Sequence, residues 1–418
     1  MAIEQAVILS GGRGTRLMPL TDSLPKPMIA VRLGLPFLFV LLRQLQDQGI
    51  KRVLLLTGYK GEVIEHSLQK LNEHHLTLNV KCVRTPDEWE TWERMRHSRD
   101  LFEEDSLVLY GDNFSVFNLP KHERSYREAG AKLFFLAAKK EKGNLSLDQT
   151  GRVISYDPKR KTSGLDYVEI GYALMSRSIF EFDHPKAKSF SDVFPALIES
   201  QFVKARWAQH HYWSVSDMKR LFETSRFLQN KKILLIDRDG VINQKMPKAE
   251  YVTRWDEFQW IEENVLGMEQ LAKRGYRFIV VSNQAGVQRG AISVEALDDI
   301  HTRMCLALKS RGIEILDIYV CPHHWDENCS CRKPKPEMLV KAAREHRFRI
   351  DQSLYIGDDP RDCEAAYAAD TKAVFIGDKT QCDRLEQAKR PVATFSSLSS
   401  AVPWILDYLK PMQEAKQK

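Results

Sequence analysis

Short apolar runs alternate with amphipathic stretches along nearly the whole chain. The runs are rich in valine, leucine and isoleucine, which is typical of buried strands, whereas the stretches between them show helical periodicity. The runs lie at Ala6–Leu9, Val53–Thr57, Leu107–Tyr110, Leu133–Ala137, Ile233–Ile236, Phe278–Val281 and Leu354–Ile356. This alternation predicts an α/β fold.

The length of the chain and one polar seam predict two domains. At 418 residues, the chain is longer than one hydrophobic core usually serves. A helical stretch, Met218–Phe227, is followed by the polar segment Gln229–Lys232, after which a new strand begins. We therefore expect two doubly wound domains, residues 1–228 and 229–410, and a polar tail over residues 411–418.

Charge and composition narrow the class of ligand. The formal net charge is +6, but Lys and Arg are interleaved with Asp and Glu, which favours small anionic substrates over nucleic acid. No segment approaches the ~18 apolar residues needed to span a bilayer, and no basic leader with a cleavage site opens the chain. We expect a cytoplasmic protein that binds neither membranes nor nucleic acid.

Two pairs of carboxylates follow predicted strands in the second half. Asp237 and Asp239 follow one apolar run, and Asp358 and Asp359 follow another. Hydrolysis of a phosphomonoester through a side-chain nucleophile needs an attacking carboxylate, a second group that protonates the leaving oxygen, and cations. Asp237 and Asp239 supply the first two groups. Asp358 is placed to hold Mg²⁺ with Asp237.

These carboxylates, together with Val281–Gln284 and Cys331–Pro336, resemble the four motifs of the haloacid dehalogenase superfamily of phosphatases. The resemblance spans residues 231–409. It implies that Asp237 becomes an aspartyl phosphate and that Asp239 acts as general acid and then as base. It also implies a Mg²⁺ site made of Asp237, Asp239 and Asp358.

The same resemblance assigns the phosphoryl group its remaining contacts. Ser282 is the phosphoryl-binding hydroxyl, with Asn283 beside it, and Lys333 is the cation that offsets the charge. Lys335 is the alternative to Lys333, and the sequence alone does not decide between them.

A short cysteine cluster predicts a second metal. Three of the seven cysteines, Cys321, Cys329 and Cys331, lie within eleven residues together with His323 and His324. Three thiolates and one imidazole match a closed structural Zn²⁺ site over residues 321–331. The resemblance favours His323 over His324, because relatives have the spacing Cys-x-His. We assign no role to the four scattered cysteines, which are typical of reduced, buried thiols.

The zinc-loop subgroup of this superfamily contains two activities. It includes D-glycero-D-manno-heptose 1,7-bisphosphate 7-phosphatases and histidinol-phosphate phosphatases, and residues 283–290 and 332–336 resemble the heptose members more closely. The resemblance implies that Arg289 and Arg332 bind substrate beside Asn283. Glu337 stands where those members usually have glycine, a difference at the expected substrate rim.

A glycine-rich segment follows the first predicted strand. Leu9–Leu17 contains glycines that would let backbone N–H groups approach a triphosphate, but it lacks the Gly-Lys-Ser/Thr of a Walker loop. With Pro25–Met28 and Tyr110–Asp112, it resembles sugar-1-phosphate nucleotidyltransferases over residues 1–228. The resemblance implies that Lys26 is catalytic and that Asp112 binds Mg²⁺. It implies nucleotide contacts from Gly11, Gly12, Gly14, Thr15 and Arg16.

Two segments depart from the nucleotidyltransferase pattern. Trp89–Arg94 replaces Leu-Gly-Thr-x-Gly-Ala, which removes the glycines that let the base lie against the backbone. Ser214 stands at the position of the second metal-binding aspartate, and a hydroxyl is a poor Mg²⁺ ligand. Asp217 as a substitute ligand and Trp92 as a base-stacking residue are hypotheses that would restore the activity.

Together the two resemblances imply consecutive reactions. A phosphatase would remove the 7-phosphate of a heptose 1,7-bisphosphate, and the first domain would activate the resulting sugar 1-phosphate with a nucleoside triphosphate. A first domain that binds a nucleotide or sugar phosphate without turnover is an alternative. Histidinol-phosphate hydrolysis is a second alternative, and a nucleic-acid end phosphatase is a weaker one because no arginine-rich stripe is evident.

Overall fold

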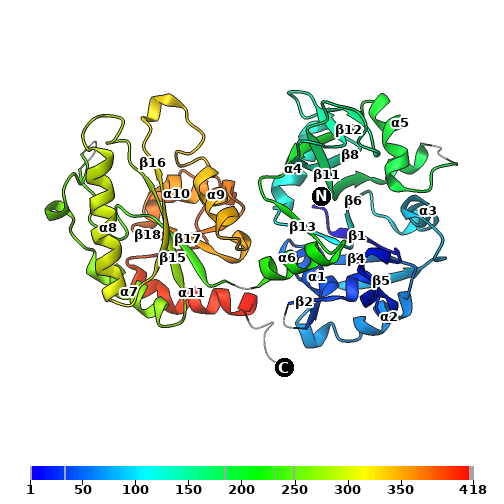
Figure 1. Cartoon of the computed structure of the whole chain (residues 1–418), viewed down its shortest axis with the longest axis horizontal. Coiled ribbons are helices and arrows are strands. Elements are labelled where there is room, and N and C mark those ends of the chain that lie inside the picture. Colours follow the sequence, from blue (N-terminus) through cyan, green and yellow to red (C-terminus); the bar gives the residue numbers. More distant parts are fainter. Residues whose placement is uncertain (1, 33, 183–184, 230, 248–249, 414–418) are drawn as a thin grey trace. The chain divides into compact units, whose positions relative to one another are not determined.

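The computed structural model describes residues 2–32, 34–182, 185–229, 231–247 and 250–413. The chain divides into two compact units, Met1–Leu228 and Gln229–Lys418. Each unit is an α/β layer structure, which confirms the predicted fold class (Figure 1). The last helix runs through Gln413, beyond the expected end of the second domain at residue 410; residues 414–418 of the expected tail lie outside the described part.

Unit 1 is built on a nine-stranded sheet with the order β10-β9-β11-β6-β1-β4-β5, to which β8 and β12 are attached through β11. The strands β6, β1, β4 and β5 are parallel, whereas β11 is antiparallel to β6. The sheet strands are β1 (Gln5–Ser10), β4 (Arg52–Thr57), β5 (Asn79–Arg84), β6 (Asp105–Tyr110), β8 (Leu133–Lys139), β9 (Leu145–Leu147), β10 (Val153–Tyr156), β11 (Tyr167–Ser176) and β12 (Val203–Trp207).

Helices and two small ribbons complete unit 1. The ribbon of β7 (Asn113–Ser115) with β13 (Tyr212–Ser214) follows the carboxyl end of β6, and β2 (Ala30–Arg32) pairs with β3 (Leu35–Pro36). The helices are α1 (Phe37–Asp47), α2 (Gly61–Leu68), α3 (Thr91–His97), α4 (Leu119–Ala129), α5 (Phe194–Glu199) and α6 (Met218–Leu228).

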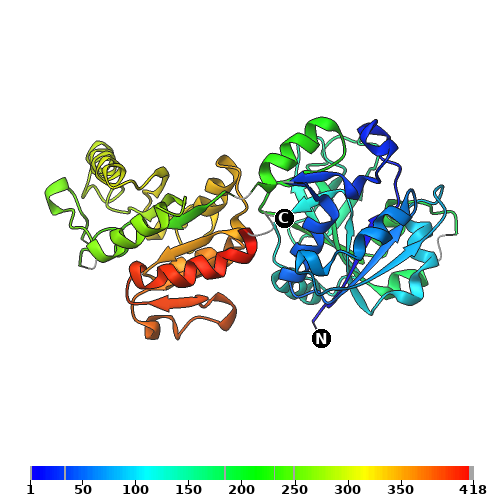
Figure 2. The same ribbon diagram turned by 90° about the horizontal axis from the view of Figure 1, so that it is seen from below.

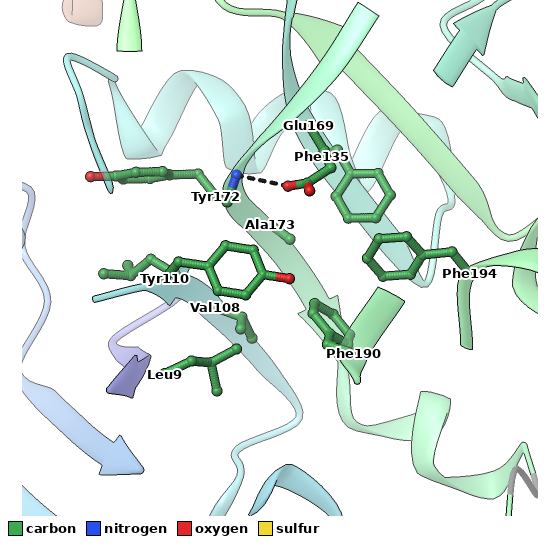
Figure 3. A pocket seen from close by; sticks show the side chains of 11 residues that line it. Leu9, Val108, Tyr110, Phe135, Glu169, Tyr172, Ala173, Phe190 and Phe194 are labelled. Carbon is green, nitrogen blue, oxygen red and sulfur yellow. Dashed lines mark hydrogen bonds between the residues drawn. The ribbon is translucent and has the colours of Figure 1, made fainter. Parts of the chain in front are cut away.

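An aromatic core lies beside strand β11 on one face of the unit 1 sheet. Phe194 packs against both Phe135 and Phe190 there, and Glu169 is the one carboxylic side chain drawn among them in Figure 3. Its Oε2 accepts a hydrogen bond from Gly171 N at 2.9 Å. The strand is irregular at this point, because the β11–β8 register shifts between Glu169 and Ala173.

Unit 2 is a six-stranded parallel sheet in the order β16-β15-β14-β17-β18-β19 (Figure 2). Because β14 lies between β15 and β17, the chain order reverses at β14, and ligands of open parallel sheets bind at such a switch point. The strands are β14 (Ile233–Ile236), β15 (Arg277–Asn283), β16 (Ile315–Cys321), β17 (Leu354–Gly357), β18 (Lys372–Ile376) and β19 (Ala393–Phe395). The helices are α7 (Glu262–Ala272), α8 (Val294–Ser310), α9 (Glu337–Glu345), α10 (Pro360–Ala368) and α11 (Leu398–Gln413).

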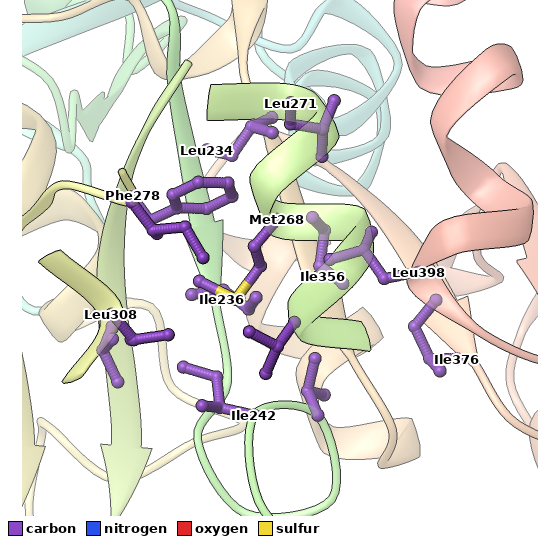
Figure 4. Close-up of a cluster of buried hydrophobic side chains, with 14 of the residues drawn as sticks. Leu234, Ile236, Ile242, Met268, Leu271, Phe278, Leu308, Ile356, Ile376 and Leu398 are labelled. Atoms are coloured by element: carbon purple, nitrogen blue, oxygen red, sulfur yellow. The ribbon is translucent and has the colours of Figure 1, made fainter. Parts of the chain in front are cut away.

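The core of unit 2 joins this sheet to α7 and α11. Met268 and Leu271 of α7 pack against Leu234, Ile236 and Ile356 of the central strands (Figure 4). These strand residues are completely buried, as expected for strands covered on both faces. The core therefore fixes the carboxyl ends of β14 and β17 side by side. In the described part of the chain no helix has both the length and the apolar character of a membrane span.

Candidate active sites

The carboxyl end of β14 carries the predicted nucleophile. Asp237 directly follows the strand, its backbone N–H donates to Ile356 O of β17 at 2.9 Å, and its side chain is almost completely buried. Burial raises the pKa of the Asp237 carboxyl; Lys333 opposes this effect, and Asp362 and Asp358 add to it.

Lys333 is the cation nearest to Asp237. Its Nζ lies 2.9 Å from Asp237 Oδ2 and 2.8 Å from Asp362 Oδ1, and it donates to Tyr355 Oη at 2.8 Å and to Val281 O at 3.0 Å. Burial disfavours its charge, but the two carboxylates raise the pKa of Lys333 above its usual range.

Lys335 points elsewhere. Its Nζ donates to Asn328 O at 2.8 Å and to Cys329 O at 2.6 Å, both in the cysteine-rich loop. The geometry therefore favours Lys333 over Lys335 as the cation beside the phosphoryl group.

Asp239 is held by several donors. Arg238 Nη2 lies 2.9 Å from each carboxylate oxygen, Asn243 Nδ2 donates to Oδ1 at 2.9 Å, and Gln284 Nε2 donates to Oδ2 at 2.6 Å. Burial would raise the pKa of Asp239, but Arg238 and these hydrogen bonds lower it below its usual value. The carboxylate is thus a fixed, ionised group beside Asp237.

A group of three carboxylates can hold a cation at the same strand ends. Ligand atoms of Asp237, Asp358 and Asp362 lie within 4.8 Å of one another. Asp239, which we expected as a further Mg²⁺ ligand, is not part of this group. Asp358 Oδ1 is buried without a hydrogen-bond partner in the described part of the structure, whereas Lys245 Nζ lies 2.9 Å from Asp358 Oδ2.

Of the other predicted contacts, Ser282 and Asn283 bond residues of this centre, whereas Arg289 and Arg332 contact residues of the cysteine-rich loop. Ser282 Oγ is buried and accepts from Gln284 Nε2 at 2.8 Å, and the Asn283 side chain bonds both the N–H and the C=O of Lys333, at 3.1 and 3.2 Å. Arg332 donates to His323 O at 3.3 Å. Arg289 has its guanidinium carbon 5.2 Å from the Trp325 ring and 5.9 Å from the Tyr251 ring.

The predicted zinc ligands form a compact cluster after β16. Cys321, His323, Cys329 and Cys331 bring three sulfurs and Nδ1 within 4.8 Å of one another. His324 instead accepts a hydrogen bond from Asp326 N and packs against Trp325 in a tilted arrangement, with ring centroids 3.8 Å apart. The geometry therefore selects His323 over His324, and the cluster can bind a metal.

In unit 1, the glycine-rich loop follows β1, and Gly12, Thr15 and Arg16 are exposed. Lys26 Nζ lies 2.8 Å from Asp112 Oδ2, so the predicted catalytic lysine and the predicted metal ligand form an ion pair. In the described residues, no cluster of three potential ligand side chains includes Asp112.

The two hypotheses that would restore the transferase pattern have different outcomes. Trp92 is buried and stacked between Phe180 and Phe190, at ring distances of 5.2 and 6.2 Å, so the prediction that it stacks on a base is wrong. Asp217 accepts from Arg220 N at 2.9 Å and from Ser216 Oγ at 3.3 Å. Its carboxylate is engaged by its own loop, and its role as a metal ligand stays a prediction.

Arg94 is a buried residue of unit 1 that the sequence analysis missed. Its guanidinium donates to Thr57 O at 2.9 Å, Trp89 O at 2.7 Å and Gly11 O at 3.3 Å, and also to Thr85 Oγ1. The sequence does give one signal for this role: arginine stands in a helical segment at the position where the nucleotidyltransferase pattern has alanine. The guanidinium ties the glycine-rich loop to the end of β4 and to the segment before α3.

Unit 2 contains further missed residues, and only one had a sequence signal. Asp362 stands three residues after Asp359 and forms a capping box with it at the start of α10, a recognisable spacing. The others are Tyr355, Lys245, Asn243, Gln284 and His301, which reach the centre from strand interiors, loops and α8.

Known proteins match both units. The nucleotidyl transferase family model matches residues 5–231, and the polynucleotide kinase 3 phosphatase model matches residues 232–389. A D-glycero-beta-D-manno-heptose-1,7-bisphosphate 7-phosphatase of Pseudomonas putida is 36% identical over 145 residues, 35% of this chain and 82% of that protein.

Two further similarities cover different parts of the chain. The histidine biosynthesis bifunctional protein HisB of Campylobacter jejuni is 37% identical over 134 residues, which is 32% of this chain and 38% of that protein. The crystal structure of HddC from Yersinia pseudotuberculosis is 25% identical, with a TM-score of 0.46, and covers 54% of this chain and 99% of that chain.

The fold, the sites and these matches define a two-unit enzyme, in which a nucleotidyltransferase-type unit precedes a phosphatase unit of the haloacid dehalogenase type. The chain belongs to the nucleotidyl transferase family through residues 5–231, more than half of its length. Its second unit is a phosphomonoesterase homologous to the heptose-bisphosphate 7-phosphatases. The predicted fusion is thereby confirmed.

Proposed function

We propose that unit 2 removes the 7-phosphate of D-glycero-D-manno-heptose 1,7-bisphosphate through an aspartyl phosphate on Asp237. The observation that carries this proposal is the buried contact of Asp237 with Lys333, with the carboxylate of Asp239 next in the same segment. The identity of the proposed substrate is taken from the names of the relatives. The alternative substrate, histidinol phosphate, would leave the nucleotidyltransferase unit without a related reaction.

The chemistry follows from the placement of the side chains. An Asp237 oxygen attacks phosphorus, the bond between phosphorus and the sugar oxygen breaks, and that oxygen takes a proton from Asp239. Because Asp239 is ionised in the free enzyme, it has to take up this proton when the substrate binds. Water then attacks the aspartyl phosphate, Asp239 accepts a proton from it, and Asp237 is released with inorganic phosphate. Lys333 offsets charge on the phosphoryl oxygens throughout, and Ser282 and Asn283 orient them.

The donor sets fit two metals. Asp237, Asp358 and Asp362 would hold Mg²⁺, which prefers a few carboxylates together with phosphate and water, and the orphaned Asp358 Oδ1 supports this fit. When bound, the ion would offset negative charge on the phosphoryl group. Cys321, His323, Cys329 and Cys331 would hold structural Zn²⁺ and so fix Arg332 and Lys333, which directly follow the last ligand.

We further propose that unit 1 transfers a nucleotidyl group from a nucleoside triphosphate to the heptose 1-phosphate that unit 2 releases, with pyrophosphate as the leaving group. Gly11, Gly12, Gly14, Thr15 and Arg16 would contact the triphosphate, Lys26 would offset its charge, and Asp112 would hold Mg²⁺. Arg289 and Arg332 would bind the sugar phosphate in unit 2. Both reactions use phosphorylated small molecules of the cytoplasm, where we place the enzyme.

A specific observation favours the alternative that unit 1 binds its ligand without turnover. Asp217 is held by Arg220 and Ser216, and Ser214 Oγ accepts from Arg220 Nη1 at 3.1 Å, so Arg220 competes with a cation for both side chains. A cation bound by one carboxylate alone would be weakly held.

The deciding experiment is mass-spectrometric product analysis with the full chain, Mg²⁺, either anomer of heptose 1,7-bisphosphate and each nucleoside triphosphate in turn. A nucleoside-diphosphate heptose supports both activities and identifies the base. Heptose 1-phosphate alone supports the phosphatase and the non-catalytic alternative for unit 1. Unchanged bisphosphate, with release of phosphate from histidinol phosphate, contradicts the proposed substrate. Asp237→Asn serves as the inactive control.

A further inference from the structure

A buried histidine of α8 contacts the arginine that lies between the two catalytic aspartates. Arg238 Nη1 lies 3.0 Å from His301 Nε2, and both side chains are buried. Because a guanidinium only donates hydrogen bonds, His301 Nε2 is the acceptor, and the neutral ring carries its proton on Nδ1. Burial and the neighbouring Arg238 lower the pKa of His301 to about 4, in agreement with a neutral ring.

The other side of the same guanidinium holds Asp239. Arg238 Nη2 reaches both carboxylate oxygens at 2.9 Å, and Nε lies 3.2 Å from Oδ1. Asn243 and Gln284 each donate one more hydrogen bond to the carboxylate. Since every partner is a donor, Asp239 is held as an ionised acceptor. His301, Arg238 and Asp239 thus form a continuous series of contacts from α8 to the site.

We propose that His301 is a positioning residue for hydrolysis of the aspartyl phosphate, because it fixes the guanidinium that aims the Asp239 carboxylate. The inference rests on the proposed role of Asp239. In this step a water oxygen attacks phosphorus, and the bond from phosphorus to the Asp237 oxygen breaks with its electron pair returning to the carboxylate. Asp239 takes the proton from the attacking water, a role for which a fixed, ionised carboxylate is suited.

Removing the His301 acceptor leaves a buried N–H of Arg238 without a hydrogen-bond partner. This energetic cost favours a shift of the guanidinium. The carboxylate would then lose the donor that contacts both of its oxygens. Misplacement of a catalytic group by about 1 Å costs on the order of 100-fold in rate, and loss of an indirect support costs about 10- to 100-fold. His301→Leu should therefore slow the second step by about 10- to 100-fold.

The test uses the full chain with Mg²⁺ and p-nitrophenyl phosphate, whose leaving group departs without a proton donor. Rapid mixing measures the burst of p-nitrophenol, and mass spectrometry after acid quenching measures the phosphorylated fraction of the enzyme. We expect His301→Leu to show a lower steady-state rate, a burst close to one per active site, and accumulated phosphoenzyme. His301→Gln, which keeps an acceptor, should restore most of the rate.

Two control variants separate positioning from loss of structure. Leu297→Ala truncates a buried side chain one turn earlier on α8 and leaves the acceptor in place, so it should lower the melting temperature without accumulating phosphoenzyme. If His301→Leu does not fold, His301→Phe keeps the ring volume and lacks the acceptor. A rate loss without phosphoenzyme, or an unchanged rate, overturns the proposal.

Asp239→Asn separates this inference from the proposed function on which it rests. This variant should accumulate phosphoenzyme more strongly than His301→Leu. If it does so while His301→Leu and His301→Phe do not, only the role of His301 is overturned. If Asp239→Asn does not accumulate it, the assignment of Asp239 fails, and the role of His301 fails with it.

Discussion

Lys333→Met is the substitution that tests the phosphatase centre most directly. The change removes an ammonium with four acceptors at 2.8 to 3.0 Å and leaves a side chain of similar length. The two buried carboxylates, Asp237 and Asp362, lose their shared counter-charge. Breaking a buried ion pair costs about 3–5 kcal/mol, and removing a group that stabilises developing charge costs on the order of 10²–10³ in kcat.

The assay combines steady-state hydrolysis of p-nitrophenyl phosphate with calorimetric unfolding of the full chain. Lys333→Met should lose about 100-fold or more in kcat and lower the melting temperature of unit 2. Lys335→Met is the matched control, because the Lys335 ammonium donates hydrogen bonds to Asn328 and Cys329 of the cysteine-rich loop. A variant at Lys333 with near-normal kcat, or a larger kcat loss at Lys335, would refute the reasoning.

Three further predictions concern the metals and a buried carboxyl. Asp358→Asn should weaken Mg²⁺ binding about 10- to 100-fold in calorimetric titration, whereas Asp359→Asn should change it little, because Asp359 bonds Arg361; equal losses would contradict the assignment. Cys329→Ser should lower the zinc content measured by elemental mass spectrometry and destabilise unit 2. Substitution of a cysteine outside the cluster, Cys305→Ser, should leave the zinc content unchanged. Burial raises the pKa of Glu169 from 4.5 to about 7. The folded state therefore binds this proton more tightly, and stability falls as the pH rises from about 4.5 to about 7. Glu169→Gln should remove this loss, which is on the order of 3 kcal/mol. The stabilising effect of this substitution in thermal unfolding should therefore be larger at pH 8 than at pH 5, and an equal effect at both pH values would count against the assignment.

The sequence predicts the parts of the phosphatase centre that lie in extended backbone at strand ends. Asp237 and Asp239 follow β14 directly, and Asp358 follows β17, so period-two geometry and the parallel sheet are sufficient to bring them to one edge. Tyr355 and His301 are not predictable in this way. Each points to the centre because of how its element packs, and an apolar pattern reports burial of a face but not the contact of one polar atom.

The strands of the two sheets also show which elements a rule based on apolar runs finds and which it misses. The predicted apolar runs correspond to interior strands of the two sheets. They do not include β16, whose sequence is interrupted by Asp317, nor the buried interior strands β11 and β18. This strand lies at the edge of the unit 2 sheet and is only partly buried. Edge strands need less apolar surface than central ones, which explains why a rule based on continuous apolar runs passes over β16.

In the glycine-rich loop of unit 1, packing and backbone conformation explain some of the glycines without any ligand. A Cβ at Gly11 would lie 2.3 Å from Arg94 Cζ, so the buried guanidinium already requires glycine there. Gly14 has a φ of +65°, which also favours glycine without any ligand. At Gly12, by contrast, no described atom lies within 4 Å of an added Cβ. Of these three glycines, Gly12 is therefore the one for which the protein itself gives no structural reason. Its missing side chain supports close approach of a phosphate to the loop, and the other two glycines do not add to that support.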